Sequence, residues 1–148
     1  MKLNKGTIYL PKSRNDKPVK WLCICAHQDD CEIMAIDGIL KGYYSKKYSF
    51  ALVETTDGGG SARTGKFKDY TDEEMKAVRI KEQQAASELG RYNSLYMLNY
   101  TSKEVKDVKN PQIADNSDEM FETAYKAAVD AGVKNPYEEA STFSTGSV

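Results

Sequence analysis

The sequence has few of the residues that define disulfide-rich, secreted or membrane proteins. Its 148 residues include three cysteines, and two of them, Cys23 and Cys25, alternate along a predicted strand, so they do not form a disulfide framework. The longest clean apolar run, residues 21–26, is far too short to cross a membrane. The polar N-terminus is broken by Pro11 and carries no recognisable signal peptide. These absences predict a cytoplasmic protein without a membrane span.

An excess of charge of one sign is also missing. Lys and Arg total 21 and Asp and Glu total 22, which gives a net charge of −1. General nucleic-acid binding needs a basic surface, so we expect no nucleic-acid partner. With 40% hydrophobic and 29% charged residues, the composition is that of a globular protein. We expect one domain over residues 1–148, in which residues 135–148 lack periodicity and form an irregular tail.

Short apolar segments alternate with amphipathic ones. Strands are predicted over residues 21–26, 48–53 and 94–98, and the run at 21–26 is typical of a strand buried on both faces. Helices are predicted from Asp29 or Asp30, from Thr71 to Gly90, and from Ser117 to Gly132. The positions expected to be buried are Ile33, Ile36, Leu40, Tyr43 and Tyr44 in the first helix and Met75, Val78, Ala85 and Leu89 in the second. This alternation predicts an α/β, Rossmann-like fold with a mainly parallel sheet flanked by helices.

The only histidine directly follows the first predicted strand. Open α/β sheets bind ligands beyond the carboxyl ends of their strands, and His27 is followed there by Asp29 and Asp30. An imidazole and a carboxylate on one tight turn can share a zinc ion, while a second carboxylate takes a proton from water. The alternative interpretation is that His27 ends a strand and one aspartate caps the helix.

The cysteines beside this histidine have several interpretations. Cys23, Cys25 and His27 share one face of the predicted strand, so a Cys-x-Cys-x-His metal site is one hypothesis. Buried structural cysteines are the second hypothesis, because free cysteine packs as a small core residue. A nucleophilic pair of Cys31 and His27 is the third.

The segment AHQDDCEIMAIDGIL, residues 26–40, resembles the Ala-His-Pro-Asp-Asp-x-Glu signature of the PIG-L/LmbE-like deacetylase family. Three further segments resemble the family in order. Residues 52–59 are similar to its second strand and Thr-Asp-Gly loop, residues 78–90 to its Arg-x-x-Glu helix, and residues 95–100 to its next strand and turn. The resemblance covers roughly residues 20–115.

The resemblance implies a Rossmann-like fold and zinc-dependent hydrolysis of the N-acetyl group of an amino sugar or related small molecule. His27 and Asp30 would be the zinc ligands, and Asp29 would be the general base. Gln28 stands where the family has proline, which removes rigidity without changing the chemistry.

Three further residues would orient groups or bind substrate. Glu32, in the first turn of the helix, would orient His27 or act at the helix N-terminus. Asp57 would lie at the start of a substrate-binding loop, near the edge of the sheet where ligands bind. Arg79 either points to the site or forms a helical ion pair with Glu82.

The sequence departs from the family in its third zinc ligand. That ligand is a histidine of a later His-x-x-His-like element, but no histidine follows His27 here. We therefore expect a partial chain that lacks C-terminal elements of the family, with replacement by Asp118 or Glu119 as the alternative. Other hypotheses are a truncated, non-catalytic member that binds metal or ligand weakly and a nucleotide- or phosphate-binding module using residues 58–60. A parallel sheet of three predicted strands is thin, and such an incomplete sheet is also compatible with a homo-oligomer.

Overall fold

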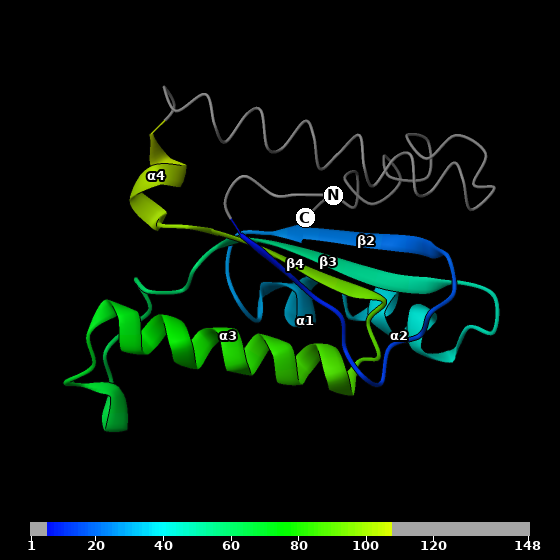
Figure 1. The fold of residues 1–148 in the computed structure, drawn as a ribbon, viewed down its shortest axis with the longest axis horizontal. Helices are drawn as coiled ribbons and strands as arrows, with labels where there is room; N and C mark the ends of the chain where they lie inside the picture. The colour runs from blue at the N-terminus through cyan, green and yellow to red at the C-terminus, as the bar shows by residue number, and fades with distance from the viewer. Residues whose placement is uncertain (1–5, 108–148) are drawn as a thin grey trace.

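The computed structural model describes residues 6–107, which form a four-stranded sheet with helices packed against it (Figure 1). The strands are β1 (Thr7–Tyr9), β2 (Val19–Cys25), β3 (Ser49–Thr56) and β4 (Ser94–Tyr100), in the spatial order β1-β4-β3-β2. β2, β3 and β4 are parallel, and β1 pairs antiparallel with β4. The expected α/β fold with a mainly parallel sheet is confirmed. The short antiparallel strand β1 was not predicted.

The helices are α1 (Asp30–Met34), α2 (Ile36–Tyr44), the 3-10 turn η1 (Gly65–Phe67), α3 (Asp72–Leu89) and α4 (Ser102–Lys106). α1, α2 and α3 lie on one face of the sheet (Figure 1). This follows from topology, because right-handed crossovers that move in one direction, β2 to β3 to β4, keep their helices on the same face. No helix within residues 6–107 is long and apolar enough to cross a membrane.

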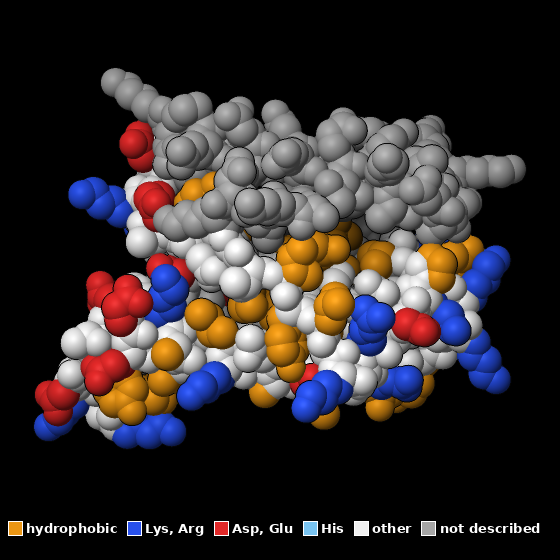
Figure 2. Space-filling view, in the orientation of Figure 1, with side chains coloured by type: hydrophobic (Ala, Val, Ile, Leu, Met, Phe, Trp, Pro, Cys, Tyr) orange, Lys and Arg blue, Asp and Glu red, His pale blue; other side chains and the backbone are white. Residues whose placement is uncertain are grey.

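The main core lies between the sheet and α1–α2. Its buried members are Cys25, Cys31, Ile39, Phe50, Leu52, Tyr92, Leu95 and Met97. A smaller cluster on the other face contains Val53, Leu98 and Tyr100. In the view of Figure 2, apolar side chains lie between Lys and Arg, whereas Asp and Glu gather mainly where α3 begins and α4 lies.

The predicted burial of the first helix is wrong. The structure breaks this helix at Ala35, whose φ of −119° and ψ of 24° are not helical. The predicted core positions Ile33, Ile36, Leu40 and Tyr44 are exposed, and the buried residues are instead Cys31, Gly38, Ile39 and Gly42. The break separates α1 from α2, and the two glycines of α2, Gly38 and Gly42, allow it to approach Phe50 of β3 closely.

The second predicted helix begins where expected. Thr71 and Glu74 form the predicted capping box at the start of α3. Its buried face differs from the prediction, because Met75 is buried but Ala85 and Leu89 are exposed. The polar residues Gln83 and Ser87 are buried in their place, because this face of α3 packs against the turn after β2 rather than against apolar side chains alone. Gly90 is the C-cap residue with a negative φ, and Arg91 takes the left-handed conformation.

β2 lies at the edge of the described sheet, and the prediction that it is buried on both faces is wrong because the side chains of one face are exposed. Leu22 and Ile24 are 37% and 55% exposed, whereas Cys25 is buried. The apolar run predicted the strand itself, but not its position in the sheet. The predicted helix 117–132, Asp118, Glu119 and the tail 135–148 lie outside the described residues.

Candidate metal centre

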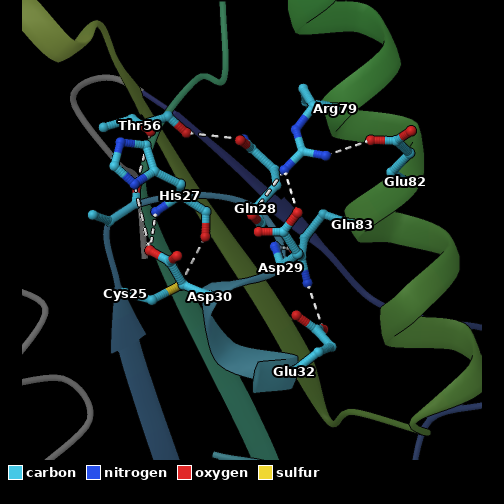
Figure 3. A network of polar contacts seen from close by, with 11 residues as sticks. Cys25, His27, Gln28, Asp29, Asp30, Glu32, Thr56, Arg79, Glu82 and Gln83 are labelled. Atoms are coloured by element: carbon cyan, nitrogen blue, oxygen red, sulfur yellow. Dashed lines mark hydrogen bonds and ion pairs between the residues drawn. The ribbon is translucent and has the colours of Figure 1, made fainter. Parts of the chain in front are cut away.

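The candidate site is the turn that links the carboxyl end of β2 to α1 (Figure 3). The end of β2 is tied to β3, because Thr56 donates to the Ala26 carbonyl from its N–H at 2.9 Å and from its hydroxyl at 2.7 Å. His27, Gln28, Asp29 and Asp30 follow Ala26 along the chain. The parallel strand order therefore presents this turn at the edge where open α/β sheets bind ligands.

His27 and Asp30 lie side by side at the surface of this turn. The His27 Nδ1 and Asp30 Oδ2 atoms are 3.4 Å apart, and Asp30 Oδ2 also accepts from the His27 backbone N–H at 3.0 Å. Their side chains are 56% and 31% exposed. The turn thus presents one imidazole and one carboxylate together to solvent, which is part of the donor set that zinc binds.

Asp29 is held from both its backbone and its side chain. It is the N-cap of α1 and has a φ of 72°, in the left-handed region that only a few non-glycine residues adopt. Its N–H donates to Gln83 Oε1 at 3.1 Å, and its Oδ2 accepts from Arg79 Nη2 at 2.9 Å. Two residues of α3 therefore set the direction in which the Asp29 carboxylate points (Figure 3).

Arg79 makes both the contact with the turn and the helical ion pair that were considered for it. Its Nη1 donates to Glu82 at 2.7 Å, which is the helical ion pair, while Nη2 also donates to the Gln28 carbonyl at 2.8 Å. The pKa of Arg79 is raised: burial lowers it, but the hydrogen bonds to Asp29 and Glu82 outweigh that effect. One guanidinium thus links α3 to two consecutive residues of the turn.

Glu32 points away from His27 and toward α3. Its Oε1 accepts from Gln83 Nε2 at 2.9 Å and from the Tyr92 hydroxyl at 2.7 Å. Burial, followed by the bond to Glu32, raises the pKa of Tyr92. In this structure, Glu32 therefore anchors α1 to α3 and to the segment before β4.

Asp57 organises the loop after β3. It is 7% exposed, its Oδ1 accepts from the Gly59 N–H at 3.0 Å, and its Oδ2 lies 3.5 Å from Lys76 Nζ. The Ser61 N–H donates to the Gly58 carbonyl. Because these two loop N–H groups already have partners, the loop is poorly suited to cradle a phosphate.

Gly58 explains why this loop lies against the turn. Its φ is 72°, and a Cβ atom there would lie 2.5 Å from Gln28 Oε1 and 2.7 Å from Arg79 Cβ. Only glycine fits this position without displacing those neighbours.

Sequence reasoning missed the role of Gln28. Its side chain is buried, and Nε2 donates to the Thr56 carbonyl at 3.1 Å, so it ties the turn to the end of β3. The only available signal was the polar residue itself, standing in place of a rigid proline.

Glu54 was also missed. It lies on β3 beside Cys25, has no exposed surface, and neither carboxyl oxygen has a hydrogen-bond partner in the described structure. Burial is the main cause that raises the pKa of Glu54 to about 8. The charge of Arg79 lowers this pKa, whereas the negative charges of Glu32, Asp29 and Asp30 raise it. The available signal was an acidic residue directly after the predicted strand 48–53.

The described residues supply part of a metal site. No group of three His, Cys, Asp or Glu side chains within residues 6–107 is arranged to hold an ion. His27 and Asp30 fit two positions of a zinc site, but a catalytic zinc normally has three protein ligands. The hypothesis of a Cys-x-Cys-x-His site has no support in this arrangement.

Comparison with known families agrees with this arrangement. Residues 22–132, more than half of the chain, match the PIG-L family model, which is described as GlcNAc-PI de-N-acetylase. No curated protein and no solved structure gives a significant match. The family match includes the turn after β2, α3 and β4.

Proposed function

The chain belongs to the PIG-L family of de-N-acetylases, and we propose that it hydrolyses the N-acetyl group of an amino sugar or related small molecule with zinc at His27 and Asp30. The observation that carries the proposal is the exposed pair of His27 and Asp30, next to an Asp29 carboxylate that Arg79 orients. Two potential ligands and a potential base therefore lie on one turn, as metal-assisted amide hydrolysis requires.

Each residue of the turn has a distinct task in the proposed reaction. Bound zinc supplies Lewis acidity, which lowers the pKa of water and polarises an acyl oxygen. Asp29 accepts the proton of the attacking water at Oδ1, while Oδ2 stays paired with Arg79. Arg79 is a positioning residue, because its contacts are with Asp29, Gln28 and Glu82.

The third protein ligand is proposed to come from outside residues 6–107. Two side chains alone bind zinc weakly compared with three, so this ligand decides between an enzyme and a weak metal binder. A nucleotide- or phosphate-binding module is disfavoured, because the Gly59 and Ser61 N–H groups of the candidate cradle already have partners.

The test combines metal content with acetate release. The purified full chain, its His27→Ala variant and its Asp29→Asn variant are analysed for zinc and assayed with N-acetylglucosamine and GlcNAc-PI. Asparagine tolerates the left-handed backbone of Asp29, so this substitution removes the base while the backbone conformation of the turn is kept. We expect His27→Ala to lose zinc, and Asp29→Asn to keep zinc while losing about 10²–10⁴-fold in rate.

The matched control is Asp37→Asn. Asp37 lies on α2 and pairs with Lys41, so its replacement changes the same charge outside the turn. Zinc that stays bound in His27→Ala, or acetate release that is unchanged in Asp29→Asn, would contradict the proposal. Zinc binding without acetate release from either substrate would favour a non-catalytic metal binder.

A further inference from the structure

The outer side of α2 carries a row of large apolar side chains that are exposed. Ile36, Leu40 and Tyr44 are four residues apart, so they lie one above another on one side of the helix. Tyr44 is 76% exposed, and Ile36 and Leu40 are each about half-exposed. At the start of the row, Ile33 and Met34 of the preceding helix α1 add two mostly exposed side chains. We call these five residues the α2 stripe.

The α2 stripe faces away from the sheet. Gly38 and Gly42, which lie against Phe50 of β3, are on the opposite side of α2, because successive helical residues are turned by about 100°. Packing against the sheet therefore explains why the inner side of α2 is buried, but it does not explain why the outer side is apolar. A helix that is apolar on both sides is normally covered on both. The outer side of α2 thus needs a partner other than the sheet.

The size and composition of the stripe suit a protein–protein contact. Single exposed apolar residues are ordinary, but a contiguous apolar patch marks an interaction site. A stable interface buries about 800 Å² on each partner, of which a little over half is apolar. Five large apolar side chains that are about half-exposed or more supply an apolar area of that order. Tyr44 also packs edge-on against Tyr43, with ring centroids 5.0 Å apart, and tyrosine is frequent among the residues that dominate interface affinity.

The charges beside the stripe favour a second copy of this chain as the partner. Asp37 and Lys41 both lie along one flank of the stripe and pair with each other at 2.6 Å. When two identical helices pack antiparallel around a two-fold axis, the same flank of each helix meets. Asp37 of one copy then lies near Lys41 of the partner subunit, and symmetry forms the reverse pair. The surface is thus complementary to itself in charge as well as apolar, as a two-fold interface requires.

We propose that the chain forms a two-fold symmetric dimer in which the α2 stripes of two copies pack antiparallel. Leu40 is the middle residue of the row on α2, so it packs near its own symmetry mate. Ile36 of one copy then faces Tyr44 of the partner subunit. This dimer does not depend on the proposed function, because its readout is the mass of the particle in solution rather than zinc content or acetate release.

The test measures the mass of the full chain by sedimentation equilibrium over a range of concentrations, and we expect the wild type to dimerise. Leu40→Lys brings two ammonium groups together at the centre of the interface and should weaken association about thirtyfold or more. Lysine is a good helix former, and circular dichroism confirms that α2 is kept. Ile24→Lys is the matched control, because Ile24 is about as exposed as Leu40 but lies on the other face of the sheet, so it should leave association unchanged.

Exchanging the two charges tests the orientation of the helices. Asp37→Lys alone should weaken the dimer, because the new lysine opposes Lys41 of the partner subunit. Adding Lys41→Asp restores the pair within each helix and the pairs between copies, so the double variant should regain most of the wild-type affinity.

Three outcomes would overturn the proposal. A monomeric wild type would leave the stripe to residues outside 6–107 or to a different protein. Association that survives Leu40→Lys but is lost in Ile24→Lys would place the interface on the other face of the sheet. A double variant that stays as weak as Asp37→Lys would contradict the antiparallel arrangement of the two helices.

Discussion

Arg79 on α3 is paired with Asp29 at the N-cap of α1, at 2.9 Å and across a separation of fifty residues. The same guanidinium group donates to the Gln28 carbonyl and to Glu82, so its plane is held in one orientation. Arginine suits this role because its rigid fork of donors can contact several oxygens at once. The carboxylate that we assign as the base is therefore positioned by a helix that is distant in sequence.

Replacing Arg79 with Gln should lower kcat more than it raises KM, by about 10–10²-fold, because misplacing a reacting group by about 1 Å costs that much. Zinc content should be unchanged, since neither His27 nor Asp30 bonds to Arg79. Steady-state kinetics of acetate release measure the effect. Lys81→Gln, an exposed change of the same charge on α3, is the control. An unchanged kcat in Arg79→Gln would show that Asp29 does not depend on this contact.

Glu54 should make the protein less stable as the pH rises. Its pKa is raised to about 8 by burial, from an ordinary value of 4.5, so the folded protein keeps a proton that the unfolded chain releases. The free energy of unfolding should therefore fall between about pH 4.5 and pH 8, by at most about 1.4 kcal/mol per pH unit. Glu54→Gln should remove this slope.

Denaturant unfolding of the wild type and Glu54→Gln across that window measures the difference in slope. Because both proteins share all other titrating groups, subtracting one curve from the other isolates Glu54. A difference between the two proteins that stays constant with pH would mean that the buried carboxyl does not titrate in this range.

Glu88 should have the opposite effect at acid pH. Its carboxylate accepts from the backbone N–H groups of Lys12 and Ser13 and from the Tyr9 hydroxyl, and these bonds lower its pKa to about 2. The stability it contributes is present above about pH 4.5 and should be lost as the pH falls toward 2. Thermal unfolding across this range should show that Glu88→Gln loses less stability toward acid pH than the wild type does. An equal loss of stability in the two proteins would argue against the conclusion that the hydrogen bonds of Glu88 hold the segment before β2 in place.

Two glycines one turn apart on α2 should respond differently to alanine. A Cβ atom at Gly42 would lie 2.6 Å from Phe50 Cβ, whereas one at Gly38 would lie 3.4 Å from the Phe50 ring. Gly42→Ala should therefore destabilise the protein by about 1–3 kcal/mol through overpacking. Gly38→Ala should be neutral or stabilising by up to about 1 kcal/mol, because alanine favours helix. Denaturant unfolding compares the two, and equal effects would contradict the close approach of α2 to β3.

The sequence predicted the features that depend on neighbouring residues. The capping box of Thr71 and Glu74 is local, because its two hydrogen bonds close within one turn. The alternation of strands and helices predicted the parallel sheet, and the position of His27 after an apolar run placed it at the binding edge. The four-part resemblance to the deacetylase family agrees with the family match over residues 22–132.

Helical periodicity failed where burial depends on the neighbouring element. It predicted that Leu40 and Leu89 face the core, but both are exposed. In α2, the close approach to β3 selects glycines for the inner face, and in α3 the inner face carries Gln83 because it bonds to Asp29 and Glu32. A hydrophobic pattern cannot show that a helix packs through glycine or through a polar network.

The sequence by itself determined the residue types of the site, since His27, Asp29 and Asp30 lie on one turn whatever the rest of the chain does. Only the tertiary structure decided which partners orient them. Arg79 meets Asp29 because the crossover from β3 to β4 places α3 beside the turn, and Glu54 becomes buried beneath the same site. Contacts between distant segments depend on how the sheet and helices pack, and spacing along one chain carries no direct record of that packing.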